Sequence, residues 1–153
     1  MSDRFRFRLE QVLDHRVRRE DLVRQELAQA MAAVAAQQER AVAADDAVRR
    51  GLEGLRRMMG EPIGLDRLRA AHEDLAILRA RAAHERSGVA RLEAVADDRR
   101  ADMVRASQDR EALVQLRRKA QLRHGAELER RDAVLMDELA SRRAGRGHQG
   151  AAA

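Results

Sequence analysis

The sequence has few of the residues on which globular cores and reactive sites depend. It contains no cysteine, tryptophan or tyrosine, one proline (Pro62) and two phenylalanines (Phe5 and Phe7). Without cysteine the chain forms neither disulfides nor thiolate metal sites, which is typical of a reducing cytoplasm. A thick globular core is not expected either, because aromatic side chains supply much of the buried area in such cores.

Long hydrophobic runs are also absent. The longest apolar run, residues 30–36, is mostly alanine and is far shorter than the roughly 20 residues that a membrane span needs. No secretory signal is visible at the start of the chain. These absences predict a protein that is soluble or attached to a membrane only peripherally.

Charge is abundant and nearly balanced. Charged residues make up 37% of the chain, but the net charge is only +5 and acids alternate with bases, which favours ordered helices over disorder. All basic residues except Lys119 are arginine, as a GC-rich genome would give. The pI near 11.1 leaves nucleic acid open as the weaker alternative for a partner.

Apolar residues recur at heptad spacing between residues 13 and 59. A seam with alternating steps of four and three residues predicts that one side of this segment packs against a partner helix. We interpret its polar positions, Glu20, Arg24, Gln38 and Asp45, as residues that fix the register of the coiled coil. The seam consists of Leu13, Val17, Glu20, Arg24, Leu27, Met31, Val34, Gln38, Ala41, Asp45, Val48, Leu52, Leu55 and Met59.

The segment Gly60-Glu61-Pro62-Ile63-Gly64 predicts the end of the first helix. Glycine favours a left-handed C-cap, and proline cannot continue the backbone hydrogen bonding. Helical spacing of leucine and alanine resumes at Leu65 and continues to residue 143. We therefore predict a helix over 9–59, a turn over 60–64 and a second helix over 65–143.

A tight turn places two such helices side by side and antiparallel. Residue i of the first helix then faces roughly residue 124 − i of the second, so that Leu13 lies near Leu113. The predicted fold is all-α: a long antiparallel two-helix coiled coil with an overhanging second helix. Residues 1–144 would form a single coiled-coil hairpin, and residues 145–153, which lack an apolar stripe, a disordered tail.

No pattern typical of catalysis is present. His72-Glu73 and His84-Glu85 begin like a zinc-protease helix, but neither histidine is followed by a second one four residues later,. We expect these histidines to be solvated or at the edge of the seam. A two-helix coil also offers no concavity that excludes water. We therefore predict no enzymatic activity, no metal site, no cofactor and no small-molecule substrate.

The N-terminus alternates basic and aromatic residues, and we expect Phe5 and Phe7 to anchor the start of the first helix on the second helix or to meet a protein partner. Four short segments follow one another along the chain: Phe5-Arg6-Phe7-Arg8-Leu9-Glu10 with Leu13 and Arg16, the Gly/Pro turn, Leu116-Arg117-Arg118-Lys119 and Met136-Asp137-Glu138-Leu139-Ala140. In the order of these segments the chain resembles the FliJ family of the flagellar export apparatus over most of its length.

The resemblance implies a cytoplasmic component of type III protein export, held peripherally at the inner face of the membrane at the flagellar base. Such a protein would insert the end of the hairpin opposite the turn into the hexameric export ATPase, like a central stalk. It would also touch the cytoplasmic domain of the export gate and escort export chaperones. The equivalent stalk of a virulence type III secretion system and a basic nucleic-acid-binding coiled coil remain alternatives.

The resemblance also implies two groups of binding residues. The group facing the ATPase comprises Phe5, Phe7, Leu9, Leu13, Arg16, Arg117, Arg118, Lys119, Arg123, Arg130 and Arg131. The group facing the export gate comprises Gln38, Val42, Leu75, Leu78 and Ala82.

Overall fold

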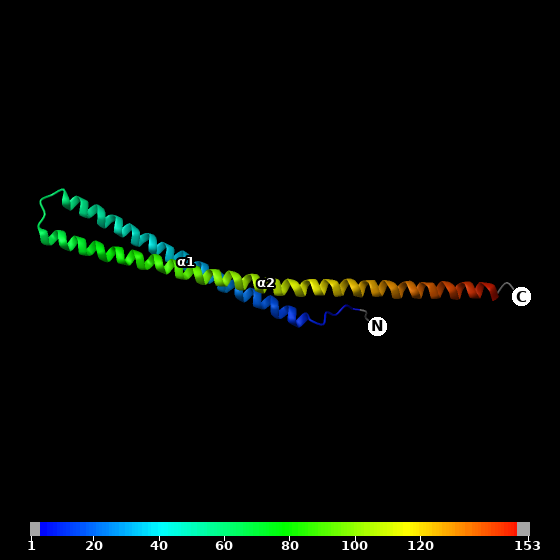
Figure 1. Ribbon diagram of the computed structural model, residues 1–153. Coiled ribbons are helices and arrows are strands. Elements are labelled where there is room, and N and C mark those ends of the chain that lie inside the picture. Colours follow the sequence, from blue (N-terminus) through cyan, green and yellow to red (C-terminus); the bar gives the residue numbers. More distant parts are fainter. Residues whose placement is uncertain (1–3, 150–153) are drawn as a thin grey trace. The chain divides into compact units, whose positions relative to one another are not determined.

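The computed structural model describes residues 4–149, and the side chains of residues 4–144. It consists of two helices, α1 (Glu10–Met59) and α2 (Leu65–Gln149), joined by a short connection (Figure 1). The described part of the chain contains no strand. The predicted all-α two-helix coiled-coil hairpin is confirmed.

Both helices are composed largely of alanine, leucine, arginine and glutamate, which are strong helix formers,. Charges at the helix ends also favour them. Glu10 lies in the first turn of α1 and Asp66 in the first turn of α2, whereas Arg56 and Arg57 lie in the last turn of α1. Acidic residues near the N-terminus and basic residues near the C-terminus interact favourably with the helix dipole and so stabilise the helix.

The connection, residues 60–64, closes α1 in a different way from the one expected. The amide of Gly60 donates to the carbonyl oxygen of Arg57 (3.2 Å) and that of Glu61 to Met58 (3.3 Å). Such bonds to the third residue back tighten the last turn and satisfy its carbonyl groups. No described residue has a positive φ angle, so the expected left-handed C-cap at glycine is wrong.

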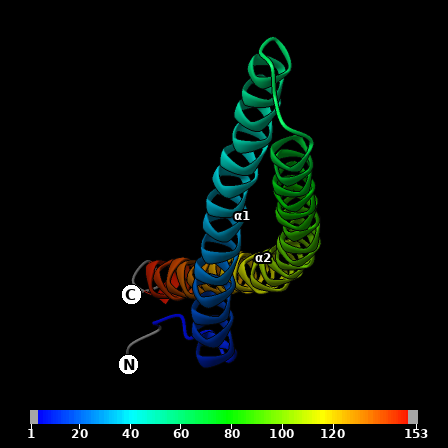
Figure 2. The same cartoon turned by 90° about the vertical axis from the view of Figure 1, so that its left-hand side faces the viewer.

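The chain divides into two compact units. The hairpin unit, residues 19–106, contains the connection and the adjoining parts of both helices; Figure 2 shows the connection joining their ends. The terminal unit, residues 1–18 with 107–153, contains the start of α1 and the last part of α2. Each unit therefore has its own contacts between α1 and α2.

The α1 seam is half as predicted. The series Leu13, Glu20, Leu27, Val34, Ala41, Val48 and Leu55 is buried or half-buried and is confirmed. In the alternating series, Asp45 and Leu52 are half-buried as predicted. The other five positions are one residue out of place, since Val17, Met31 and Met59 are 39%, 49% and 64% exposed, and Arg24 and Gln38 are exposed as well. At these five positions the seam uses the preceding residue instead: Arg16, Val23, Ala30, Gln37 and Met58, all buried or half-buried. Ala44 and Gly51, which precede Asp45 and Leu52, are buried and half-buried as well.

Small residues explain this correction. Alanine and glycine add little to an apolar pattern, but they allow close approach of the two helices. A Cβ added to Gly51 would lie 3.1 Å from Cδ1 of Leu78, and one added to Gly88 would lie 2.8 Å from Nε2 of Gln37. On α2, the residues at helical spacing that are buried or half-buried include Leu68, Leu75, Leu78, Ala82, Leu92, Ala96, Ala106 and Leu113, whereas Leu65 is 71% exposed.

Polar contacts join the two helices inside the hairpin unit. Nε2 of Gln37 donates to the carbonyl oxygen of Glu85 (3.1 Å) and to its carboxylate (2.5 Å). Arg99 forms an ion pair with Glu26 at 3.3 Å, and Arg86 pairs with Asp45. Most of these contacts lie within a few residues of the predicted 124 − i pairing, which fixes the antiparallel alignment.

The predicted end of α2 needs correction. The helix ends at Gln149, so residues 145–149 are helical and do not belong to a disordered tail; residues 150–153 lie outside the described part. Each glycine in this stretch lowers helix propensity by about 1 kcal/mol without forbidding the helix. A helix that is already formed needs no new nucleation to extend.

Candidate functional site

The segment before α1 lies against α2 within the terminal unit. The ring of Phe5 packs against that of His124, with centroids 5.7 Å apart and planes inclined by 45°. Phe5 and Phe7 are both half-buried, and the carbonyl oxygen of Phe7 accepts a hydrogen bond from the amide of Glu10 (3.2 Å). The expected anchoring of this segment on the second helix is confirmed for Phe5.

An apolar groove with basic borders lies beside this anchor. Arg6 and Arg8, on either side of Phe7 in the sequence, supply its charge, and two residues of α2 supply much of its apolar wall. Such a groove suits a partner segment in which an apolar side chain lies next to an acidic one. The groove is lined by Arg6, Phe7, Arg8, Leu9, Leu116 and Ala120.

Ion pairs tie the start of α1 to α2. Glu10 pairs with Arg117 at 3.2 Å, and Arg16 pairs with Asp109 at 3.0 Å. Leu13, between them, is only 5% exposed. Arg16, Arg117 and Leu13 therefore hold the two helices together in this unit.

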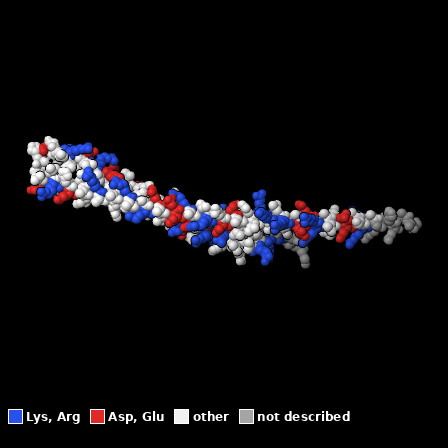
Figure 3. Space-filling model, in the orientation of Figure 1, with Lys and Arg blue, Asp and Glu red and all other residues white. Residues whose placement is uncertain are grey.

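Four other basic side chains of the terminal unit have no partner within the described part of the chain. Arg118, Lys119, Arg123 and Arg130 are exposed and form no hydrogen bond or ion pair with any described residue. Arg131 pairs with Glu127 one turn away, at 3.5 Å. On the face in Figure 3, basic and acidic side chains interleave over much of the surface. Unpaired cations remain available to an acidic partner.

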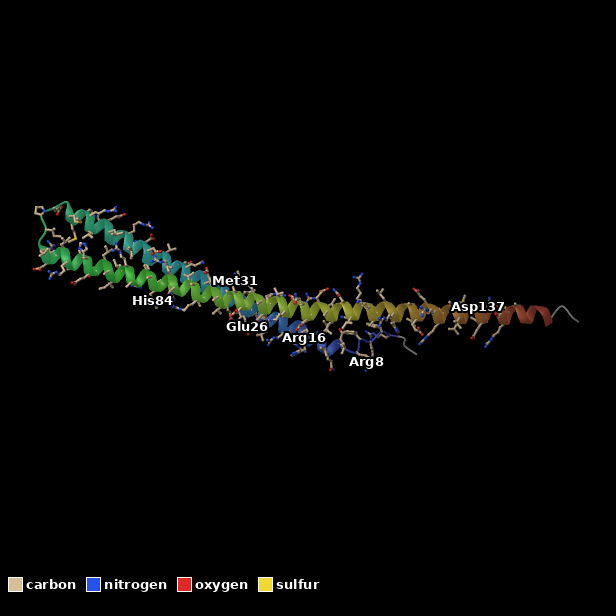
Figure 4. The ribbon with its side chains drawn as sticks, in the orientation of Figure 1. Arg8, Arg16, Glu26, Met31, His84 and Asp137 are labelled. Atoms are coloured by element: carbon tan, nitrogen blue, oxygen red, sulfur yellow. The ribbon has the colours of Figure 1, made fainter. Side chains whose placement is uncertain are left out.

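The structure gathers the predicted ATPase-facing residues in one unit. All of them belong to the terminal unit, and Figure 4 shows Arg8 and Arg16 at the N-terminal part of the chain. Phe7 and Leu9 line the apolar groove, whereas Phe5 packs against His124. Leu13, Arg16 and Arg117 lie between the two helices. Of the remaining cations, Arg131 is paired with Glu127, and those without a partner among the described residues are Arg118, Lys119, Arg123 and Arg130. The groove wall formed by Leu116 and Ala120 was not predicted as a binding feature.

The predicted gate-facing residues do not form one surface. Leu75 and Ala82 are 4% and 1% exposed, and Leu78 is half-buried against Gly51. These three residues belong to the seam of the hairpin unit and pack against α1. Only Gln38 and Val42 are exposed, and both lie on α1.

The histidine pairs show no site. His72 is exposed, with Nδ1 2.9 Å from the carbonyl oxygen of Leu68, and His84 is exposed too. Among the described residues, no three histidine or carboxylate side chains are grouped as a metal ion would require. The helices, as far as they are described, include none that is long and apolar enough to cross a membrane.

These features define a class: an antiparallel two-helix coiled coil whose terminal unit presents apolar and basic side chains for binding. The family model described as the flagellar FliJ protein matches residues 5–149, so the chain belongs to the FliJ family. At the level of the family, it is a protein of flagellar export. No curated protein and no solved structure gave a match to the chain.

Proposed function

We propose that the protein binds the hexameric flagellar export ATPase like a central stalk, through its terminal unit. The observation that carries this proposal is the groove beside Phe7, which lies in the same unit as the unpaired cations Arg118, Lys119 and Arg123. Basic side chains speed encounter with acidic or polar loops of a ring, and apolar side chains in a groove hold the complex.

The export gate is the second partner. Its cytoplasmic domain binds the exposed face of α1 that carries Gln38 and Val42, because Leu75, Leu78 and Ala82 are occupied in the seam. Met31 is exposed and lies on the same face by helical spacing (Figure 4),. The protein couples the state of the ATPase to substrate entry at the inner face of the membrane, and it escorts export chaperones there. It catalyses no reaction itself.

Charge reversal of Arg118, Lys119 and Arg123 to glutamate tests ATPase binding. We expect the triple variant to lose stimulation of the purified cognate ATPase, because three unpaired cations become anions. Helicity measured by circular dichroism should not change, since none of the three residues takes part in an ion pair or in the seam. Arg117 is left unchanged because its pair with Glu10 holds the start of α1.

A matched control reverses Arg50, Arg67 and Arg69, which are exposed in the hairpin unit and form no ion pair with described residues. This variant has the same change in net charge and should stimulate the ATPase as the unmodified protein does. Stimulation that survives the change in the terminal unit at physiological salt, or that is lost equally in the control, would show that the terminal unit is not the binding surface.

A further inference from the structure

The last described part of α2 has an apolar face that no other described segment covers. Every residue from 129 to 144 is exposed, and Val134 and Leu135 are 59% and 56% exposed. Figure 4 shows Asp137 on this part of the helix. A shallow hollow lies on the same face as Val134. It is lined by Glu127, Arg130, Arg131, Val134 and Leu135.

Four charges flank Val134 and Leu135 along the same face. Glu127 and Arg131 precede the apolar pair, and Glu138 and Arg142 follow it. At 3.6 residues per turn, these four residues and the apolar pair fall within a stripe about 100° wide. The order along the stripe is acid, base, apolar pair, acid, base.

This order is complementary to its own reverse. If a second copy of the stripe runs in the opposite direction, Val134 and Leu135 lie at the same height as the apolar pair of that copy. Glu127 then faces Arg142, and Arg131 faces Glu138. A twofold axis between residues 134 and 135 makes each contact occur twice, as in other symmetric dimers. Parallel pairing in register would instead place like charges opposite each other.

We propose that this stripe is a self-association surface on which α2 of a second copy of this chain packs antiparallel. Glu138 and Arg142 form no hydrogen bond or ion pair with any described residue. Glu127 and Arg131 have their own pair at 3.5 Å, but this pair is exposed, and exposed pairs contribute little. Association therefore adds ion pairs and covers apolar surface without breaking a strong contact.

The size of the stripe sets the strength of association. It offers two apolar side chains in each copy, so it buries far less surface than a permanent dimer does. Its ion pairs lie at the surface and are screened by salt. The dimer is therefore concentration-dependent and is favoured at low ionic strength. This proposal does not depend on ATPase binding.

Complementary charge variants test the proposal by sedimentation equilibrium of the full chain over a concentration series. Glu127→Arg with Glu138→Arg makes the stripe wholly basic, and Arg131→Glu with Arg142→Glu makes it wholly acidic. Each double variant alone should raise the dimer dissociation constant at least about tenfold, because like charges then face each other. An equal mixture of the two should associate again as a heterodimer.

A control places the same charge change on the other side of the helix. Glu129→Arg with Asp132→Arg should leave dimerisation unchanged. All of these side chains are exposed, so folding should be retained, which circular dichroism checks. The proposal is overturned if the unmodified chain stays monomeric at low salt and at the highest concentration reached. It is also overturned if the basic and acidic variants fail to associate when mixed, or if the control dissociates as they do.

Discussion

Helix α2 has different surroundings in the two units. In the hairpin unit, Leu75, Ala82 and Ala96 are buried against α1. In the terminal unit, every residue of α2 from 129 to 144 is exposed, although this stretch still contains valine, leucine and methionine. The two regions differ in whether α1 covers them. Covered apolar residues stabilise the fold, whereas uncovered ones are available to other molecules.

The largest effect should come from a charge placed in the seam. Replacing Ala82 with aspartate should lower the free energy of unfolding by about 2–4 kcal/mol, because the carboxylate would be buried without a partner. The same replacement at Ala133, which is exposed, should change it by about 0.5 kcal/mol or less. Denaturant midpoints measured by circular dichroism compare the two. Equal effects would mean that the seam does not run through Ala82.

Two glycines give a comparison of intermediate size. Alanine at Gly125 in the terminal unit meets nothing within 4 Å and should stabilise the protein by about 1 kcal/mol through helix propensity. Alanine at Gly88 would press on the amide of Gln37 and weaken its hydrogen bonds to Glu85, which offsets that gain. Unfolding free energies of the two variants check this difference. A gain at Gly88 as large as that at Gly125 would contradict the close approach described at Gly88.

The smallest effect should appear as a pH dependence at Asp102. A hydrogen bond from Arg105 holds the pKa of Asp102 below its usual range, with Arg105 and Arg99 also acting through their charge, while desolvation acts in the opposite direction. A lowered pKa stabilises the fold above the pKa of the unfolded chain, and this stabilisation is lost as the pH falls through the folded-state pKa.

Melting temperatures between neutral and acidic pH check this expectation. Asp102→Asn should melt slightly below the unmodified protein at neutral pH, and the difference should disappear on acidification. A difference that stays constant over this range would mean that the charge of Asp102 is not responsible.

Heptad spacing predicted much of the fold from the sequence. It gave both helices and the seam of α2, because leucine recurs there at positions that only a helix brings to one side, and the Gly/Pro segment gave the turn. Heptad spacing failed at five positions of the second α1 series, because a small seam residue such as Ala30 carries almost no hydrophobic signal. The larger apolar residues Val17 and Met31 led to a predicted seam that lies one residue further along the chain. The size of the side chains at the contact decides which of two neighbouring residues lies in the seam, and heptad spacing contains no information on size.

The binding residues were harder to predict. An apolar residue at a heptad position looks the same whether it meets α1 or another protein. The resemblance to the FliJ family assigned Leu75, Leu78 and Ala82 to a partner, and their spacing could not show that α1 covers them. The sequence predicted that Phe5 contacts the second helix, but it did not predict His124 as the residue contacted. That choice depends on how the N-terminal segment runs along α2. The self-complementary order of charges can be found in the sequence alone. Only the structure shows that α1 leaves this part of α2 uncovered, so that a second copy could pack there.

Gln37 also affects how the two helices find each other during folding. A slip of one heptad would place its amide opposite Leu78 or Leu92 instead of Glu85, and a buried amide without an acceptor costs roughly 1–3 kcal/mol. Most of the other seam residues are apolar, and apolar residues distinguish less sharply between neighbouring alignments. Gln37 therefore favours the native alignment of the two helices over alignments shifted by one heptad,.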